Sequence, residues 1–315
     1  MSLRLLRPGV QSTVQSGPRH GLRHQGVPYA GAADALSLAL ANRLVGNSLA
    51  APGVEMSLSG AAFLLQSPAV LAVAGAESEV SLNGQPVGMH RVLDLRGGDT
   101  LDVGPAISGA RSYLAVAGGI HVPLVLGSVS TYLPAGIGGF RGRSLRSGDE
   151  LVIGGERPDS PADVTPREFR PCFGDTVTLR AVSGREFDVL DEASRGAVYA
   201  EAYSVTPRGD RMGLALDGPR LRVRSEGRLD SRPVFPGTVQ CPESGEPFLL
   251  GADCQTSGGY PRIAEVIRGD RFLIGQLRSG SRVRFLERDP ETARADYLAV
   301  LDFWRNWLPD PETVI

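Results

Sequence analysis

The chain has 315 residues and a mass of 33.3 kDa, and its 42% hydrophobic content is enough to bury two cores of ordinary size. Its net charge is −2 and its pI is near 6.1, so no overall positive field attracts nucleic acid or an anionic membrane. All 33 basic residues are arginine, and the absence of lysine excludes a Schiff-base enzyme and a Walker-type phosphate loop.

The composition and the spacing of apolar residues predict a mainly β protein. The sequence has 40 glycines and 23 prolines, and its apolar residues come in short runs bounded by turn residues. These runs lie at 61–74, 111–117, 122–127, 248–252 and 263–267. A turn of the form Arg-x-Gly-Asp/Ser, followed by alternating apolar positions, begins at Arg96, Arg146 and Arg278. We expect this turn to precede the closing strands of β-barrels.

A glycine-punctuated loop at 17–31 leads into a helix predicted over 32–46. Leu36, Leu40 and Leu44 recur every four residues, and Asp34 suits the positive N-terminal end of the helix. The loop delivers Arg19, His20, Arg23 and His24 close to that end, where anions are favoured. The loop therefore predicts a site for a carboxylate or a phosphate.

A proline-rich segment at 157–171 divides the chain roughly in half. Its prolines oppose regular structure, and charged residues replace apolar ones there. We therefore predict an N-terminal β-barrel-like domain at 1–156 and a C-terminal one at 172–315.

The segment 253–267 combines polar groups with paired glycines ahead of an apolar run. Gly258 and Gly259 allow a positive φ or a close approach to a ligand, while the run at 263–267 predicts a buried strand or short helix. Asp253 and Gln255 are the candidate chemical groups, and a catalytic Asp253 is expected to contribute little to packing. An ordinary turn is the alternative.

A C-terminal helix is predicted over 290–308, with Pro290 in its first turn. Leu298, Leu301, Trp304 and Leu308 fall on one stripe, which predicts core packing. The alternative is that Trp304 and Trp307 face a partner protein.

Metal and thiol chemistry are not indicated. Three cysteines lack a C-x-x-C spacing, and the glycines and proline around His20 and His24 favour a loop over a metal-binding helix. Cys254 has no histidine nearby in sequence, so a buried or bystander thiol is expected. The start lacks an apolar signal region and no stretch reaches the ~20 apolar residues of a membrane span, so a cytoplasmic protein is expected.

Four segments, 17–47, 111–132, 209–218 and 253–267, carry a resemblance to a known family. The chain resembles the family that holds the C subunit of the bacterial ATP-dependent 5-oxoprolinase, the KipA-type proteins and one half of the carboxyltransferase domain of biotin-dependent urea carboxylase. The sequence departs from the usual family residues at Ser16, Pro18, His121, Val129 and Gly209. These departures bear on efficiency or substrate more than on fold.

The resemblance implies two cyclophilin-like β-barrels, with few helices, and three alternative functions. The first is a C subunit that acts with the A and B subunits to open the lactam of 5-oxoproline to glutamate, with ATP as co-substrate together with magnesium. The second is carboxyl transfer to a urea-like amide, with biotin arriving on a partner protein. The third is a KipA-type binding protein without catalysis. An enzyme of this kind is expected to be active only in its complex.

Candidate site residues follow from the matched motifs and from their chemistry. Catalysis is assigned to Asp210, Asp253 and Gln255, with an Asp210–Arg211 structural ion pair as the alternative for the first. Substrate binding is assigned to Arg19, Arg23, His24, Arg211 and Tyr260, because a guanidinium fork suits a carboxylate. Gly31, Gly258 and Gly259 are assigned to the anion-binding backbone, and no metal ligand is assigned. The motifs from both halves of the chain are expected to contribute to one site.

Overall fold

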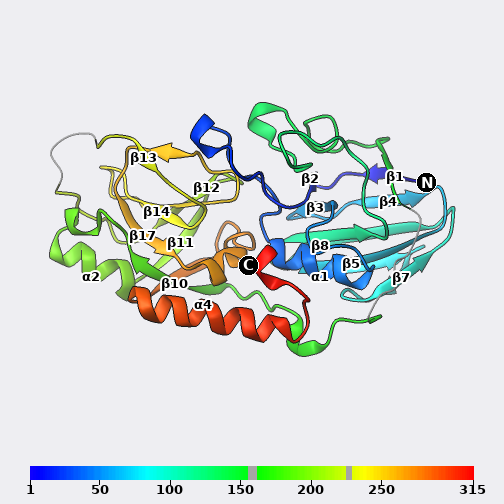
Figure 1. Cartoon of the computed structure of the whole chain (residues 1–315). Helices are drawn as coiled ribbons and strands as arrows, with labels where there is room; N and C mark the ends of the chain where they lie inside the picture. The colour runs from blue at the N-terminus through cyan, green and yellow to red at the C-terminus, as the bar shows by residue number, and fades with distance from the viewer. Residues whose placement is uncertain (155–161, 225–228) are drawn as a thin grey trace. The chain divides into compact units, whose positions relative to one another are not determined.

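A computed structural model of the chain describes residues 1–154, 162–224 and 229–315. These residues form two compact units (Figure 1). The first unit comprises Met1–Arg19, Ala30–Phe173 and Trp304–Val314, and the second comprises His20–Tyr29, Gly174–Phe303 and Ile315. The predicted domains at 1–156 and 172–315 stay a prediction, and residues 157–161 of the expected linker lie outside the described residues.

A nine-stranded half-barrel sheet forms the core of the first unit. Its path runs β2-β3-β8-β4-β1-β9, and β5 joins β6 and β7 to β8. The strands are β1 (Ser2–Arg7), β2 (Gln11–Gln15), β3 (Gly53–Ser57), β4 (Ala62–Leu65), β5 (Ala69–Leu82), β6 (Gln85–Val87), β7 (Val92–Leu95), β8 (Thr100–Val116) and β9 (Glu150–Val152). Leu3, Leu5, Val54, Phe63 and Leu114 are fully buried on its inner face. The apolar side chains of alternate strand positions therefore build one continuous core.

Helix α1 (Ala35–Leu44) packs against β5 and β8 (Figure 1). It is shorter than the predicted 32–46. Its first residue follows Asp34, whose carboxylate accepts a hydrogen bond from the Ser37 amide at 2.9 Å and so caps the helix. The amides of Ala32 and Ala33 bond instead to the Ser16 carbonyl and the Glu55 carboxylate, at 3.0 and 2.9 Å. Tertiary contacts thus hold these two residues outside the helix.

A closed barrel with the order β10-β17-β14-β15-β12-β11-β18 forms the second unit, with the ribbon β13-β16 beside it. Its strands are β10 (Thr176–Ser183), β11 (Ala202–Gly209), β12 (Gly213–Asp217), β13 (Arg232–Pro233), β14 (Thr238–Gln240), β15 (Phe248–Leu250), β16 (Ser257–Gly258), β17 (Arg262–Val266) and β18 (Arg282–Glu287). Strands β10 and β18 pair in parallel and close the barrel. The mainly β class is therefore confirmed, and residues 263–266 of the predicted run at 263–267 lie on strand β17.

Two further helices of the second unit are absent from the sequence prediction. Helix α2 (Glu192–Ala200) packs against β18, and its N-terminus is capped by the Asp191 carboxylate, which accepts from the Ser194 amide at 2.8 Å. Gly196 within it weakens the sequence signal for a helix. Helix α3 (Arg271–Ile274) is a single turn. The 3-10 turns are η1 (Arg23–Gln25), η2 (Leu133–Ala135), η3 (Arg167–Phe169), η4 (Phe187–Val189), η5 (Arg268–Asp270) and η6 (Pro311–Thr313).

The three Arg-x-Gly-Asp/Ser turns have the same geometry. In each, the amide of the arginine donates to the side chain three residues later: Arg96 to Asp99 at 2.6 Å, Arg146 to Asp149 at 2.7 Å and Arg278 to Ser281 at 3.2 Å. The intervening glycine has φ of 92°, 87° and 89°, a left-handed conformation that favours glycine. Strands β8, β9 and β18 follow these turns, and of the three only β18 closes a barrel.

The apolar run at 122–127 forms no strand in this fully described part of the chain. Its only bridge joins Val125 to Ser128, and Leu124 and Leu126 are exposed. Leu126 and Gly127 both have positive φ, at 52° and 79°, so the backbone turns instead of extending.

The described part of the proline-rich segment is more ordered than its composition indicates. Val164 forms a β-bridge with Arg91, the Thr165 amide donates to the His90 carbonyl at 2.9 Å, and η3 follows. Residues 164–169 are therefore held against the rest of the first unit.

The C-terminal helix α4 spans Pro290–Arg305, three residues short of the predicted end. Leu301, Trp304 and Leu308 are buried as expected, but Leu298 is 47% exposed and is not part of the buried stripe. Trp304 and Trp307 both contact Phe169, with ring centroids 5.9 Å apart in each pair. Core burial of both tryptophans is thus confirmed. No helix of the described residues has the length and apolarity of a membrane span.

Candidate functional site

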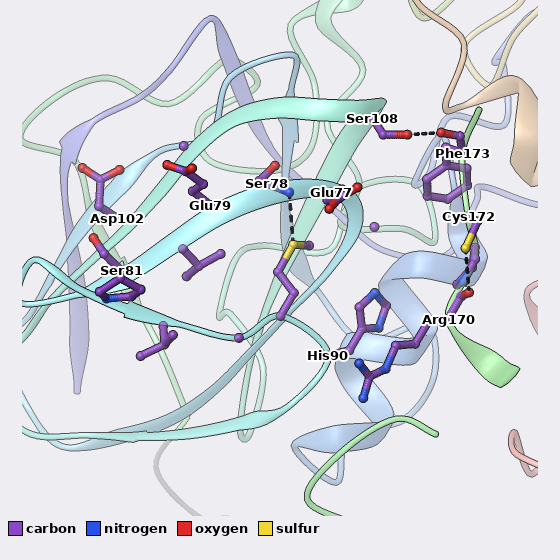
Figure 2. A pocket seen from close by; sticks show the side chains of 18 of the residues that line it. Glu77, Ser78, Glu79, Ser81, His90, Asp102, Ser108, Arg170, Cys172 and Phe173 are labelled. Atoms are coloured by element: carbon purple, nitrogen blue, oxygen red, sulfur yellow. Dashed lines mark hydrogen bonds between the residues drawn. The ribbon is translucent and has the colours of Figure 1, made fainter. Parts of the chain in front are cut away.

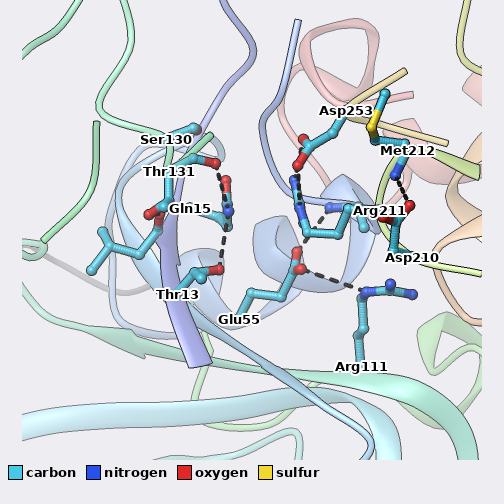
Figure 3. A network of polar contacts seen from close by, with 12 residues as sticks. Thr13, Gln15, Glu55, Arg111, Ser130, Thr131, Asp210, Arg211, Met212 and Asp253 are labelled. Carbon is cyan, nitrogen blue, oxygen red and sulfur yellow. Dashed lines mark hydrogen bonds and ion pairs between the residues drawn. The ribbon is translucent and has the colours of Figure 1, made fainter. Parts of the chain in front are cut away.

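The turn between β11 and β12 presents Arg211 to Asp253. Nε and Nη2 of Arg211 donate to the two carboxylate oxygens of Asp253, both at 2.9 Å (Figure 3). The Asp253 amide also donates to the Arg211 carbonyl at 2.9 Å. Both side chains are buried, at 5% and 2% exposure. The two predicted residues therefore form one buried, bidentate ion pair.

Asp210 makes turn hydrogen bonds, instead of the ion pair with Arg211 that was the structural alternative to a catalytic role. Its carboxylate accepts from the Met212 amide at 2.7 Å, and its own amide donates to the Gly213 carbonyl at 3.1 Å (Figure 3). It lies exposed in the turn. The structural ion pair of Arg211 is thus with Asp253 and not with Asp210.

The burial of Asp253 contradicts the expectation that this carboxylate contributes little to packing. A buried carboxylate that accepts both hydrogen bonds of a buried guanidinium fork contributes to stability, because its removal takes away the charged partner of that fork. The Arg211–Asp253 pair thus joins the β11–β12 turn to the loop of residues 251–261, which we call the Asp253 loop.

Gln240 on β14 holds the other end of the Asp253 loop. Its Oε1 accepts from Gln255 Nε2 at 3.1 Å, and its Nε2 donates to the Tyr260 carbonyl at 3.3 Å. Gln240 is 2% exposed. This residue was not predicted from the sequence, although a glutamine inside a short apolar strand is a signal for a buried polar contact.

The two glycines of the Asp253 loop do not form a left-handed turn. Neither Gly258 nor Gly259 has a positive φ, so the expectation of a positive φ at these positions is wrong. A Cβ on Gly258 would lie 2.7 Å from Gln240 Nε2. Glycine is therefore required at 258 because the loop passes close to a fixed side chain.

Arg23 connects the loop of residues 20–29 to the Asp253 loop. Its Nη2 donates to the carbonyl oxygens of Val234, Gln255 and Thr256, the last two at 3.3 Å. Its guanidinium stacks over the rings of Tyr29 and Phe235, at 4.6 and 5.0 Å from the centroids. Arg23 and the Asp253 loop therefore lie in contact, while a single site built from motifs of both halves stays a prediction.

The remaining predicted ligands differ in accessibility. His24 is exposed and contacts Gln25 at 3.2 Å, and Tyr260 is 53% exposed. Arg19, in contrast, is fully buried in the first unit and donates to the carbonyls of Val125, at 3.2 Å, and Ser130. Gly31 has a φ of 95°, a left-handed conformation that favours glycine, and its role in binding an anion stays a prediction.

A buried polar network in the first unit was not predicted. Glu55 Oε2 accepts from the Tyr113 hydroxyl and from the Ala33 amide, both at 2.9 Å, and Arg111 lies 3.5 Å from Oε1 (Figure 3). Burial, followed by the charge of Glu55, raises the pKa of Tyr113 well above its usual range. A second cluster centres on Gln15, whose Nε2 donates to Thr13 and to the Thr131 carbonyl at 3.0 and 3.1 Å. A glutamate at an inward strand position is the signal that could have indicated Glu55.

No three of the His, Cys, Asp and Glu side chains of the described residues gather to hold a metal ion. Arg19, Arg23 and Arg211 all bond to oxygens of the protein. Cys254 is buried, as expected, and burial raises the pKa of its thiol to about 11.

Comparison with known proteins gives a consistent result. A family model described as carboxyltransferase domain, subdomain A and B, matches residues 25–287. A protein of Escherichia coli, named as the C subunit of 5-oxoprolinase, is 38% identical over 291 residues, which are 92% of this chain and 93% of that protein. A protein of the same name from Haemophilus influenzae is 34% identical over 276 residues, 87% of each chain. The structure of the Kluyveromyces lactis urea amidolyase matches with a TM-score of 0.89 and 26% identity over 96% of this chain, which spans 20% of that larger chain.

Proposed function

Because the chain belongs to the carboxyltransferase domain family, we propose that it acts as the C subunit of an ATP-dependent 5-oxoprolinase. The observation that carries the proposal is the 38% identity to the Escherichia coli protein along nearly the full length of both chains. In the proposed reaction, water adds to the lactam carbonyl of 5-oxoproline, the ring C–N bond breaks and the nitrogen takes up a proton. Hydrolysis of ATP to ADP and phosphate drives the step, and glutamate is released.

The contacts of the Asp253 loop support a division of labour among the predicted residues. We assign Arg211, Asp253 and Gln240 to positioning, because their polar groups bond to each other or to the loop. Exposed Tyr260 and half-buried Gln255 are left as the groups that orient the substrate amide. Asp210 and His24 are the exposed candidates for proton transfer.

Partner proteins are part of the proposal. Both bacterial relatives are named as one subunit of an enzyme, which supports a complex, and we propose the A and B subunits as partners. Since the chain has no lysine for a phosphate loop and its predicted arginines bond to protein oxygens, we assign the ATP phosphates and magnesium to one of these partners. The cytoplasmic location belongs to the same proposal, because an ATP-consuming complex works where ATP is kept.

The structural match to the urea amidolyase favours a second candidate function. The TM-score of 0.89 supports carboxyl transfer from carboxybiotin to a urea-like amide. A biotin-acceptor lysine is absent from the sequence, so biotin would arrive on a partner protein. A KipA-type binding role without catalysis is the third alternative.

Reconstitution distinguishes these candidates. The purified chain is mixed with the A and B subunits, 5-oxoproline and ATP, and glutamate is measured. We expect release only when all three proteins are present, and negligible release from this chain alone. Tyr260→Phe should lower turnover roughly tenfold through loss of one hydrogen bond to the reacting amide, whereas Arg4→Gln, on the exposed face of β1, should change nothing. Release that does not depend on the chain would reject the proposal. Carboxylated urea formed in a parallel mixture of the chain with urea and a carboxybiotin-carrying protein would support the second candidate.

A further inference from the structure

A cavity of about 1080 Å³ opens in the first unit, apart from the Asp253 loop (Figure 2). One wall is β5, a second is the segment 84–90, and a third is the strap at 167–173. The strap is fastened there by the Ser108 hydroxyl, which donates to the Phe173 carbonyl. We call this space the Arg170 cavity.

Arg170 brings a cation into the cavity that no carboxylate of the described residues neutralises. Its Nε donates to the Thr165 carbonyl at 2.8 Å, which fixes the direction of the guanidinium. Among the described residues, no carboxylate forms an ion pair with it. A half-buried guanidinium without a counter-ion is the group that a planar carboxylate fits best.

His90 lies beside Arg170 at the same end of the cavity (Figure 2). Its side chain is 7% exposed, and its Nδ1 has no hydrogen-bond partner within the described residues. Burial, aided by the charge of Arg170, lowers the pKa of His90 to about 4, so the ring is neutral near pH 7. Its φ of 57° is unusual for a residue other than glycine, and it is held by backbone bonds to Val73 and Thr165, at 2.7 and 2.9 Å. Such a strained backbone and unsatisfied nitrogen are typical of a binding position.

The β5 wall carries the opposite charge. Glu77 and Glu79 are exposed along it, and neither carboxylate has a cationic partner in the described part of the chain. A ligand with a negative charge at both ends would be repelled by this wall, whereas a neutral amide or an ammonium group would not.

We propose that the Arg170 cavity binds a small molecule with one carboxylate, held by Arg170 and His90, whose other end is neutral or cationic and faces Glu77 and Glu79. This site is separate from the Asp253 loop and does not depend on the proposed lactam chemistry. Free amino acids and monocarboxylates with a neutral amide belong to this class, and dicarboxylates and phosphate do not.

Binding to the purified full chain tests the proposal, with L-alanine, 5-oxoproline, succinate and inorganic phosphate as probes. Chemical shifts of labelled arginine side chains report occupancy. We expect saturable shifts with L-alanine or 5-oxoproline at concentrations up to roughly 10 mM, and none with succinate or phosphate. Arg170→Gln should weaken binding at least roughly tenfold, because a charge-assisted hydrogen bond is lost.

Two further variants separate loss of the ligand contact from loss of local structure. Ser81→Trp places an indole in the cavity without touching the Arg170–Thr165 bond, and it should also abolish the shifts. Arg4→Gln, on the exposed face of β1, is the matched arginine control and should bind as the natural chain does. The proposal is overturned if neither monocarboxylate gives a saturable shift, if succinate or phosphate binds as well, or if both cavity variants bind unchanged. Since no step of the assay needs glutamate release, failure here leaves the proposed function untouched.

Discussion

The Asp253 loop and the Arg170 cavity use arginine in opposite ways. In the loop, Arg211 is nearly inaccessible and both of its forked nitrogens bond to Asp253. In the cavity, Arg170 has one backbone contact and no carboxylate partner among the described residues. The first arrangement stabilises the fold, and the second keeps a charge available for a ligand.

The difference shows what a motif can and cannot indicate. The segment 253–261 attracts notice because its residues are unusual together, but a buried ion pair produces the same pattern as a catalytic carboxylate. Arg170 and His90 lie in no motif, and they become a candidate site only through burial, backbone strain and missing partners. Whether a polar side chain has a hydrogen-bond or ion-pair partner is therefore a better criterion for a binding group in this chain than its place in a motif.

The largest expected effect is from Asp253→Asn. The substitution replaces the charged partner that accepts both hydrogen bonds of the buried Arg211 fork by a neutral amide, so we expect a loss of about 3 kcal/mol in unfolding free energy. Urea denaturation of the purified variant measures this, with Asp210→Asn in the exposed turn as the smaller-effect control. If Asp253→Asn abolished glutamate release at unchanged stability, the carboxylate would be catalytic and the contrast between the two arginines would fail.

A smaller loss is expected from Gly258→Ala. The new methyl group meets the Gln240 amide, which cannot move freely because it bonds to Gln255 and Tyr260. We expect about 1–3 kcal/mol of destabilisation from this overpacking. The double variant with Gln240→Ala should lose less than the sum of the two single variants, since the clash is then relieved. Strictly additive losses would show that the loop does not press on Gln240.

Acid sensitivity tests two half-exposed ion pairs, one in each unit. Hydrogen bonds from Arg143 lower the pKa of Asp149, and hydrogen bonds from Arg262 lower the pKa of Glu186. A folded-state pKa below the unfolded value gives stability that is present above the unfolded pKa and lost as pH falls through the folded one. We expect Asp149→Asn and Glu186→Gln each to flatten the decline of stability between roughly pH 5 and pH 2, by less than about 1 kcal/mol. An unchanged acid profile in both variants would contradict these assignments.

The smallest expected effect is a gain from Gly196→Ala in helix α2. A Cβ at this position meets no atom within 4 Å, and the glycine φ is not positive. Alanine should therefore add up to about 1 kcal/mol to the unfolding free energy by its higher helix propensity. Thermal denaturation provides the measurement, and a loss of stability would indicate that α2 needs the freedom of glycine.

The patterns that the sequence predicts well are local ones. The stripe of Leu36, Leu40 and Leu44 predicts α1, and the Arg-x-Gly-Asp/Ser turns recur with their expected geometry, because both depend on residues within one or two turns of chain. The first residue of a helix depends on residues that are distant in sequence. Residues 32 and 33 are withheld from α1 by Ser16 and Glu55, which are distant in sequence.

The candidate site depends on contacts that a single sequence does not record. Arg23 is correctly placed near the Asp253 loop through the family motifs, but its partners turn out to be backbone carbonyls. Gln240 and Glu55 are buried polar groups whose importance rests on partners from other strands. The error at Leu298 is similar, since helical spacing alone does not say which of two adjacent stripes faces the core.

The parallel pairing of β10 with β18 has a consequence for the order of folding. Thr176 lies opposite Arg282, so the barrel of the second unit closes only after nearly all of its chain has been brought together. Loop-closure entropy opposes such long-range pairing, and the turn at Arg278–Ser281 can form on its own long before it. The edges of β10 and β11 that pair with β18 therefore stay unpaired during synthesis until about the last tenth of the chain is made. Barrel closure is thus a late step of synthesis.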